Sequence, residues 1–317
     1  MNEIGGYIEL DELISNEYYP DLIALNTARN ALVYLVRSKG IEKIYIPYFL
    51  CDSVSNVCTR ENIPFEYYHI DKNFEPIFER ELKENEFLYI VNFYGQLTEE
   101  RINALKIKHQ HIIVDNVQAF FDSPIGNIPT IYSCRKFFGV PDGAYLSCDS
   151  DRLELETDVS MNRMKHILGR FEGNSASDYY SDFQSNDALF DELPLRYMSK
   201  LTHNVLGAID YNRVMEKRNS NWTLLHILLG EKNKLELNKP NGPYMYPFLC
   251  DNGAAVRKKL AEKKIYIPTL WPNVLDFNGC ELEKDYAVNI LPLPIDQRYG
   301  ETEMKQMVFE LLRILEL

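Results

Sequence analysis

Short apolar runs alternate with segments of helical periodicity over the first half of the chain. In ALNTARNALVYLVRSKG the apolar residues recur at helical spacing, Asn26 or Thr27 can cap the start of a helix, and Gly40 can end it. The run KIYIP predicts a strand closed by Pro47, and a helix is predicted after it, through Cys58. Further strands are predicted in PFEYYHI, FLYIVNFYG and HIIVDN, with a helix in TEERINALKIKH. This alternation predicts a mostly parallel, doubly wound α/β sheet.

The pattern changes in the second half. Residues 151–193 are rich in Asp, Ser, Asn and Tyr, which predicts an exposed, partly mobile connection. A long helical region is predicted next, and the remaining pattern of strand, helix, strand, strand and helix predicts a small α+β domain. We therefore expect a large domain over residues 1–200, in which an arm over 1–21 packs on the body or on a partner subunit. A linking helix and the small C-terminal domain are expected over residues 201–317.

The charge and the cysteines narrow the class of protein. Thirty-four Lys and Arg face forty-seven Asp and Glu, a net charge of −13 that argues against a general nucleic-acid binder but permits a local basic pocket. The six cysteines are scattered, with no C-x-x-C pair and no His at zinc-ligand spacing, so the sequence predicts no metal site. No charged leader and no membrane-length apolar run is visible. We expect a reduced, soluble protein of the cytoplasm.

Two candidate catalytic residues, Asp115 and Lys136, lie between His111 and Cys148. Asp115 ends a short apolar run, at the strand end where open α/β sheets bind their ligands. Lys136 lies between two apolar segments, and burial of an ammonium is costly unless the group is paired, neutralised or covalently used. A lysine with a lowered pKa and a carboxylate are what pyridoxal phosphate chemistry requires. Taken singly, Asp115 could merely end a strand and Lys136 could lie on the surface.

The ordered motif DNVQ followed by YSCRKFFGVPDGAYL resembles the DegT/DnrJ/EryC1/StrS family of fold-type I, pyridoxal-phosphate-dependent sugar aminotransferases. The resemblance implies a fold-type I large domain with a small C-terminal α+β domain. It also implies that Lys136 forms the Schiff base with pyridoxal 5'-phosphate and that Asp115 pairs with the pyridine nitrogen. Gln118 would contact the ring hydroxyl, and Ser133 the phosphate.

Other parts of the chain match the family less closely. Its phosphate-cradling segment at a helix start corresponds to Thr27, Ala28, Arg29 and Asn30, and a helix N-terminus is a natural anion site. Cys51 falls where relatives place an aromatic ring over the cofactor. The resemblance also matches Arg196 to a region that reaches the phosphate of the other subunit, although the sequence itself favours a solvent-facing Arg.

The resemblance implies a homodimeric aminotransferase. Its amino donor would be Glu or Gln, and its acceptor a keto sugar, nucleotide-linked, in the biosynthesis of surface polysaccharides or secondary metabolites. Two alternatives stay open at this point: a pyridoxal phosphate enzyme acting on a non-sugar carbonyl, and a non-catalytic fold-type I protein that binds a sugar nucleotide or a partner. The sequence leaves the sugar, the aminated carbon and the donor undetermined.

Overall fold

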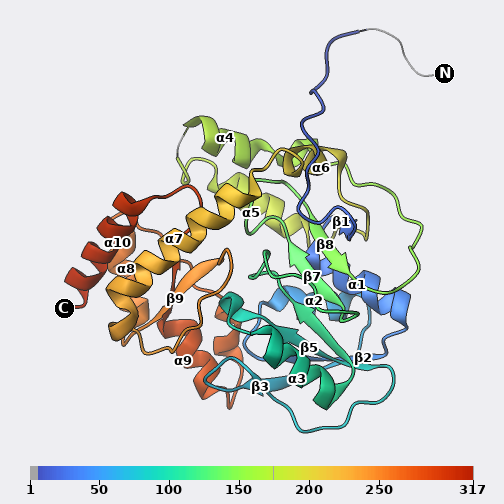
Figure 1. Ribbon diagram of the computed structural model, residues 1–317, viewed down its shortest axis with the longest axis horizontal. Helices are drawn as coiled ribbons and strands as arrows, with labels where there is room; N and C mark the ends of the chain where they lie inside the picture. The colour runs from blue at the N-terminus through green and yellow to red at the C-terminus, as the bar shows by residue number, and fades with distance from the viewer. Residues whose placement is uncertain (1–5, 174, 317) are drawn as a thin grey trace.

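A mixed sheet of eight strands lies at the centre of the computed structural model, which describes residues 6–173 and 175–316 (Figure 1). The strand order is β1-β8-β7-β6-β5-β2-β3-β4. The five strands from β7 to β3 in this order run parallel, and β1, β8 and β4 add antiparallel partners. The predicted mostly parallel sheet is confirmed. The strands are β1 (Ile23–Leu25), β2 (Lys43–Pro47), β3 (Phe65–Ile70), β4 (Pro76–Ile77), β5 (Glu86–Val91), β6 (Ile112–Asp115), β7 (Thr130–Ser133) and β8 (Ala144–Ser147).

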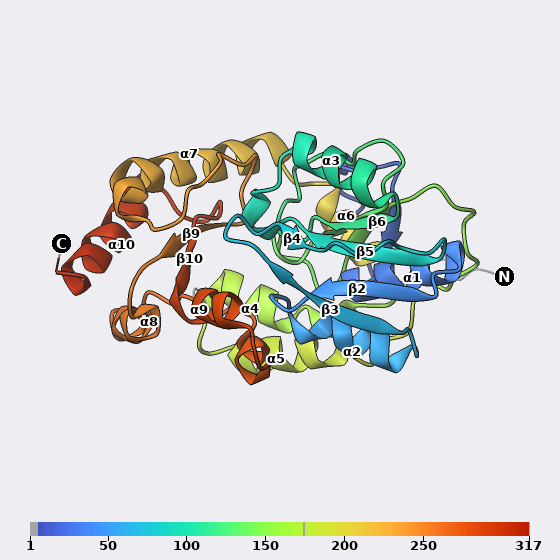
Figure 2. The ribbon, with the colours of Figure 1, turned by 90° about the horizontal axis from the view of Figure 1, so that it is seen from below.

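Helices cover both faces of this sheet. Figure 2 shows α2 (Asp52–Arg60) below the strands and α3 (Glu99–His109) above them, and α1 (Ala28–Lys39) packs against α2. The start of α1 is capped as predicted, because the Thr27 hydroxyl accepts the N–H of Asn30 at 3.0 Å.

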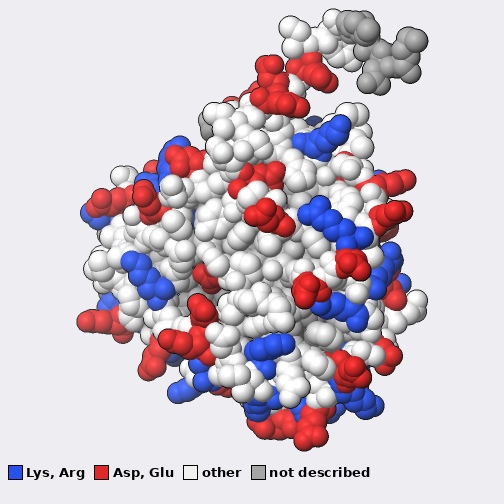
Figure 3. Space-filling model, turned by 45° about the vertical axis from the view of Figure 1, so that its right-hand side comes forward, with Lys and Arg blue, Asp and Glu red and all other residues white. Residues whose placement is uncertain are grey.

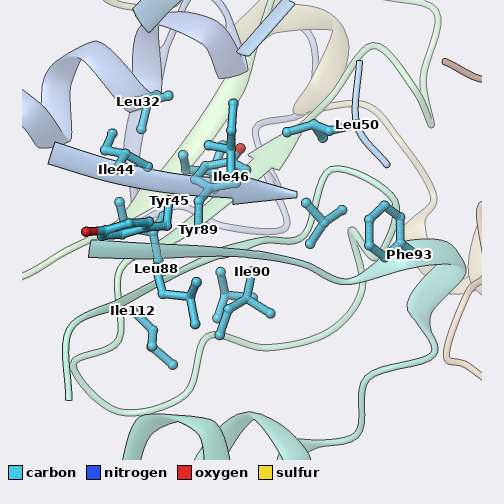
Figure 4. Close-up of a cluster of buried hydrophobic side chains, with 14 of the residues drawn as sticks. Leu32, Ile44, Tyr45, Ile46, Leu50, Leu88, Tyr89, Ile90, Phe93 and Ile112 are labelled. Atoms are coloured by element: carbon cyan, nitrogen blue, oxygen red, sulfur yellow. The ribbon is translucent and has the colours of Figure 1, made fainter. Parts of the chain in front are cut away.

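The middle of each central strand is apolar because helices cover the sheet on both sides. Figure 4 shows Ile44 on β2, Leu88 and Ile90 on β5, and Ile112 on β6, packed with Leu32 of α1. None of these five side chains is more than 1 % exposed. This core fixes the strand ends at the sheet edge where the candidate site lies.

The segment after β8 contains helices that the sequence did not predict. Residues 151–193 were expected to be an exposed connection, yet they include α4 (Lys165–Gly173) and α5 (Tyr180–Leu189). The long helical region predicted next consists of two helices, α6 (Lys200–Leu206) and α7 (Tyr211–Leu229). The interruption includes Gly207, where an added Cβ would lie 2.9 Å from the carbonyl oxygen of Ile14.

The C-terminal part is built on a two-stranded antiparallel sheet of β9 (Met245–Leu249) and β10 (Ile290–Pro294). It carries α8 (Gly253–Glu262), α9 (Glu281–Asn289) and α10 (Glu301–Ile314). The second of the three strands predicted for the small domain, which corresponds to KKIYIP at 263–268, is absent from the described residues. After α8, Lys264 takes a left-handed conformation with φ of 62°, and Pro268 has no N–H to pair. Short 3-10 turns are η1 (Phe93–Gly95), η2 (Met161–Arg163), η3 (Gly230–Lys232) and η4 (Pro272–Asp276).

The described part of the N-terminal arm projects from the body (Figure 1). The predicted arm over 1–21 begins outside the described residues, and residues 6–17 form no helix or strand. The arm is anchored near α6, where the N–H of Asn16 donates to the carbonyl oxygen of Gly207 at 2.9 Å. Figure 3 shows acidic and basic side chains interspersed over one face of the molecule. No helix within the described residues is both long and apolar enough to cross a bilayer.

Candidate active site

Four strands bring their carboxyl ends to one edge of the sheet. Asp115 is the last residue of β6 and Ser133 the last of β7, while Tyr48 follows β2 and Asn92 follows β5. The chain adds strands in opposite directions from the β2–β5 pair, which makes this edge a topological switch point. Open α/β sheets place their ligands at such a point.

Asp115 is a buried carboxylate held by two hydrogen bonds. It is 2 % exposed, its Oδ1 accepts the N–H of Val117 at 2.8 Å, and its Oδ2 accepts the hydroxyl of Tyr89 at 2.7 Å. Burial raises the pKa of Asp115, while Lys136, the Val117 N–H and Tyr89 act in the opposite direction. The carboxylate is therefore fixed in orientation but still has lone pairs for a ligand.

Lys136 lies in the tight turn after β7, where the N–H groups of Phe137 and Phe138 both donate to the carbonyl oxygen of Cys134. The two phenylalanines pack into an aromatic cluster, with Phe138 5.0 Å from Phe120 between ring centroids. The apolar sequence around Lys136 thus anchors the turn.

The Lys136 ammonium has no carboxylate within ion-pair distance in the described part of the chain, and its Nζ lies 5.6 Å from the ring centroid of Tyr244. Burial lowers the pKa of Lys136, Asp115 acts to raise it, and Arg29 and Arg135 lower it further. A lysine in this environment is more readily a free amine than a surface lysine.

Gln118 and Ser133 both carry polar atoms available to a ligand. Gln118 is 1 % exposed and its Oε1 accepts the N–H of Tyr94 at 2.8 Å. Within residues 6–173 and 175–316, neither the Gln118 amide nitrogen nor the Ser133 hydroxyl makes a hydrogen bond.

The start of α1 offers free donors. The N–H groups of Ala28 and Arg29 have no acceptor in the described part of the chain, as is usual in a first helical turn. The Nε of Arg29 is buried and lies 3.0 Å from a carboxylate oxygen of Asp191, without hydrogen-bond geometry. Asn30 differs, because its amide donates to the carbonyl oxygen of Pro194 at 2.9 Å and its oxygen accepts from Arg60 at 3.1 Å. The Asn30 side chain is thus committed to the body of the protein.

The β2–α2 loop supplies a thiol to the site but no free aromatic ring. Cys51 is close enough to Lys136 to act on its pKa, in the direction opposite to burial. The ring of Tyr48 stacks on Tyr67 with centroids 4.8 Å apart, and Phe49 packs edge-on against Trp271 at 4.5 Å. Both rings are therefore used in packing against other aromatic residues.

Sequence reasoning missed the contribution of α5. The guanidinium carbon of Arg135 lies 3.9 Å from the ring centroid of Phe190, and two of its nitrogens lie 3.2 and 3.3 Å from Oδ1 of Asp187. Burial lowers the pKa of Arg135 to about 10. Its position beside Lys136 in the sequence was the available signal. Arg196, by contrast, pairs with Glu156 at 3.0 Å.

The residues present fit pyridoxal phosphate. The group needs an amine, a carboxylate for the ring nitrogen, a donor for the ring hydroxyl and an anion site. Lys136, Asp115 and the free Gln118 amide nitrogen supply the first three. The unpartnered Ser133 hydroxyl, the first N–H groups of α1 and the buried Arg29 Nε supply the fourth.

No protein-family model and no curated protein matches the sequence. Solved structures do match. NtdA from Bacillus subtilis, with bound cofactor PMP, has a TM-score of 0.66 at 14% identity over 93% of this chain and 73% of that one. A DegT DnrJ EryC1 StrS aminotransferase from Brucella abortus has a TM-score of 0.61 at 14% identity over 92% of this chain and 85% of its own. Helicobacter pylori PseC has a TM-score of 0.61 at 13% identity over 92% of this chain and 86% of its own.

This chain shares their fold. The fold-type I α/β architecture expected from the DNVQ and YSCRKFF motifs is therefore confirmed. At this level of identity, the roles of individual residues have to be argued from the geometry of the chain itself.

Proposed function

We propose that this protein is a pyridoxal-phosphate-dependent aminotransferase that moves an amino group from an amino acid to a keto sugar. The observation that carries the proposal is the placement at one sheet edge of a buried carboxylate, Asp115 at the end of β6, and of Lys136 in the turn after the neighbouring strand β7. A buried carboxylate and a lysine with a lowered pKa are both costly to fold, which favours a role in chemistry over a structural role.

The residues divide the work as follows. Bound pyridoxal phosphate supplies an electron sink and carries the amino group between substrates. Lys136 would hold the cofactor and would move a proton at the reacting carbon, for which its lowered pKa suits it. Asp115 keeps the ring nitrogen protonated, and Tyr89 fixes the orientation of that carboxylate.

The phosphate and ring hydroxyl are assigned to free hydrogen-bonding groups and to the Arg29 guanidinium, which lies beside Asp191. Ser133, the N–H groups of Ala28 and Arg29, and the Arg29 side chain would hold the phosphate, with Thr27 capping the helix. The Gln118 amide would donate to the ring hydroxyl. Cys51 would lie beside the cofactor without stacking on it.

The acceptor in our proposal is a sugar linked to a nucleotide. Two features support it: PseC, a protein of the same fold, is an aminotransferase involved in the biosynthesis of pseudoaminic acid, and Arg29 and Arg135 bring positive charge close to Lys136. Glu or Gln is the proposed donor, and a role in surface polysaccharide or secondary-metabolite biosynthesis in the cytoplasm belongs to the same proposal.

We also propose a homodimer. Residues of the N-terminal arm expose large apolar side chains, among them Tyr7 at 98%, Ile8 at 90% and Ile14 at 75%. Contiguous exposed apolar residues are typical of a surface that is covered in an assembly. Light scattering of the purified protein, with and without residues 1–14, tests this: a dimer that dissociates on truncation is expected.

The decisive experiment is an absorbance spectrum with added pyridoxal phosphate, before and after borohydride, with mass spectrometry of the Lys136 peptide. A long-wavelength band and a reduced adduct on Lys136 are expected. Lys136→Ala should lose both, along with amino transfer from Glu or Gln. The exposed Lys258→Ala serves as the matched control and should keep them.

A non-catalytic role is the second candidate. The Asn30 side chain is bound to the backbone of Pro194, and Arg29 and Arg135 lie beside Asp191 and Asp187. These contacts leave fewer groups free to bind the cofactor phosphate, which favours the non-catalytic role. A protein that binds a sugar nucleotide but forms no adduct on Lys136 would establish this role. If an adduct forms but amino transfer occurs only to non-sugar carbonyls, the protein is still an aminotransferase, and only the proposed keto-sugar acceptor is wrong.

A further inference from the structure

Three metal-ligating side chains converge at a place remote in sequence from the Asp115–Lys136 site. His69 lies on β3, and Cys280 and Glu283 lie at the start of α9. One ligand atom from each of the three lies within 4.8 Å of the others. The Nδ1 of His69 is 2.9 Å from Oε1 of Glu283.

Burial makes this cluster unusual. The Glu283 side chain is 3% exposed, and Cys280 is fully buried. The Glu283 carboxylate also accepts the N–H of Ile70 at 3.2 Å, which fixes its orientation. Within the described residues, the only hydrogen bond of the Cys280 thiol is to the carbonyl oxygen of Asn278, at 3.7 Å. A buried carboxylate and a buried, nearly unpartnered thiol are thus held side by side.

The ligand set matches one class of cation. Imidazole nitrogen, thiolate sulfur and carboxylate oxygen are the three ligand types that zinc takes in proteins, whereas magnesium and calcium take oxygen. One thiolate and one carboxylate would neutralise a divalent ion without a further counter-charge. The His69 side chain is 45% exposed, so water can reach a fourth position.

We propose that His69, Cys280 and Glu283 bind one divalent ion of the zinc class, with water as the fourth ligand.

The neighbouring contacts give the site a structural role. The ring of Tyr48 lies 4.7 Å from that of His69 and restricts the imidazole. Tyr286, on the same helix as Glu283, donates its hydroxyl to the carbonyl oxygen of Lys72 at 3.0 Å. The ion would reinforce this junction between β3 and α9, tying the C-terminal part of the chain to the main sheet. The proposal is independent of the pyridoxal phosphate chemistry.

Cobalt and zinc titrations of the chelator-treated protein test the site. We expect one Co²⁺ per chain, tetrahedral d–d bands and a sulfur-to-cobalt charge-transfer band, all displaced by one equivalent of Zn²⁺ but not by excess Mg²⁺. Zn²⁺ should also raise the melting temperature. Removing an outer-shell partner typically weakens metal binding by roughly 10–100-fold, so losing a direct ligand should cost at least about 100-fold.

The variants separate a metal site from a plain ion pair. Cys280→Ser should lose the charge-transfer band, and Glu283→Gln and His69→Gln should each weaken Zn²⁺ binding by at least about 100-fold. Cys148→Ser, a half-buried cysteine elsewhere, is the control and should bind as wild type.

Unchanged binding in the His69 or Cys280 variant would overturn the proposal, as would the absence of a charge-transfer band in the wild type. Either result would leave His69 and Glu283 as an ion pair beside a bystander thiol. Since His69 is partly exposed, His69→Gln is expected to fold even if Cys280→Ser does not.

Discussion

The hydroxyl of Tyr89 donates a hydrogen bond of 2.7 Å to Oδ2 of Asp115, joining two adjacent parallel strands at the candidate active site. Tyr89 is itself fully covered, and the hydroxyl of Tyr68 donates to its carbonyl oxygen at 2.7 Å. The carboxylate that would face the ring nitrogen is thus positioned by a second layer of buried tyrosines.

Tyr89→Phe should weaken pyridoxal phosphate binding by roughly tenfold or more, because a hydrogen bond to a charged group contributes about 1.5–3 kcal/mol. Without this bond the pKa of Asp115 rises further. As the pH is lowered, Asp115 should therefore become protonated, and cofactor binding should be lost, at a higher pH than in the wild type. Cofactor titrations from acid to neutral pH measure both effects. Tyr68→Phe removes a buried hydroxyl that does not touch Asp115 and should leave the pH midpoint in place.

Arg135→Gln should move the pH dependence of adduct formation at Lys136. The Arg135 charge lowers the pKa of Lys136, so its removal raises that pKa, and the plateau of adduct formation should shift to higher pH. Absorbance at a series of pH values, with borohydride trapping, records the shift. Arg37→Gln removes a distant arginine whose side chain is 54% exposed, and it should not shift the profile. An unmoved midpoint in Arg135→Gln would contradict this electrostatic account.

Asp142→Ala should destabilise the protein by roughly 2–4 kcal/mol, since it leaves several buried donors unpaired. Asp142 is fully buried and accepts from the N–H and hydroxyl of Ser199 and from the hydroxyl of Thr202. These bonds tie the β7–β8 hairpin to the start of α6. Urea denaturation measures the loss, with the exposed Asp149→Ala expected to lie within about 0.5 kcal/mol of wild type.

Arg218→Lys tests a buried guanidinium that links the C-terminal part to the Lys136 turn. Arg218 is 1% exposed and donates to Pro243 at 2.9 Å and to Gln297 at 2.9 Å. A lysine cannot reproduce this planar set of donors, so we expect a loss of roughly 2–4 kcal/mol. Thermal unfolding is the measurement. Arg213→Lys, exposed on the same helix, should unfold as wild type does.

Glu17 makes the attachment of the N-terminal arm dependent on pH. Burial alone would raise the pKa of Glu17, but hydrogen bonds from His203 and Tyr145 bring it below 4.5. A lowered folded-state pKa contributes stability above the unfolded-state value, and that stability disappears as pH falls through the folded-state pKa. Glu17→Gln should therefore be less stable than wild type at pH 7, with the difference shrinking toward pH 3. The exposed Glu12→Gln should show no such trend.

The features that could be predicted from the sequence were those that depend on residues close together in the chain. The cap of α1 at Thr27 and the ordered motif around Asp115 and Lys136 are local, and they gave the fold and the centre of the site. Long-range contacts were not predictable: the bond from Tyr89 to Asp115, and the packing of Phe190 against Arg135, depend on strand order and on a helix folding back. The composition of residues 151–193 concealed α4 and α5 because, within these two helices, only Asn186 is buried, so there is no apolar periodicity from which a buried helix face could be predicted.

Asp187 and Asp191, on either side of Phe190 in the sequence, affect how tightly Arg29 and Arg135 can bind a negatively charged ligand. Asp191 and Asp187 already neutralise these arginines. An incoming anion therefore has to displace carboxylates of the protein itself, which act as a built-in competitor. The affinity that is measured will be the difference between two sets of ion pairs, and strengthening the contacts of α5 will weaken binding without any change in the residues that touch the ligand.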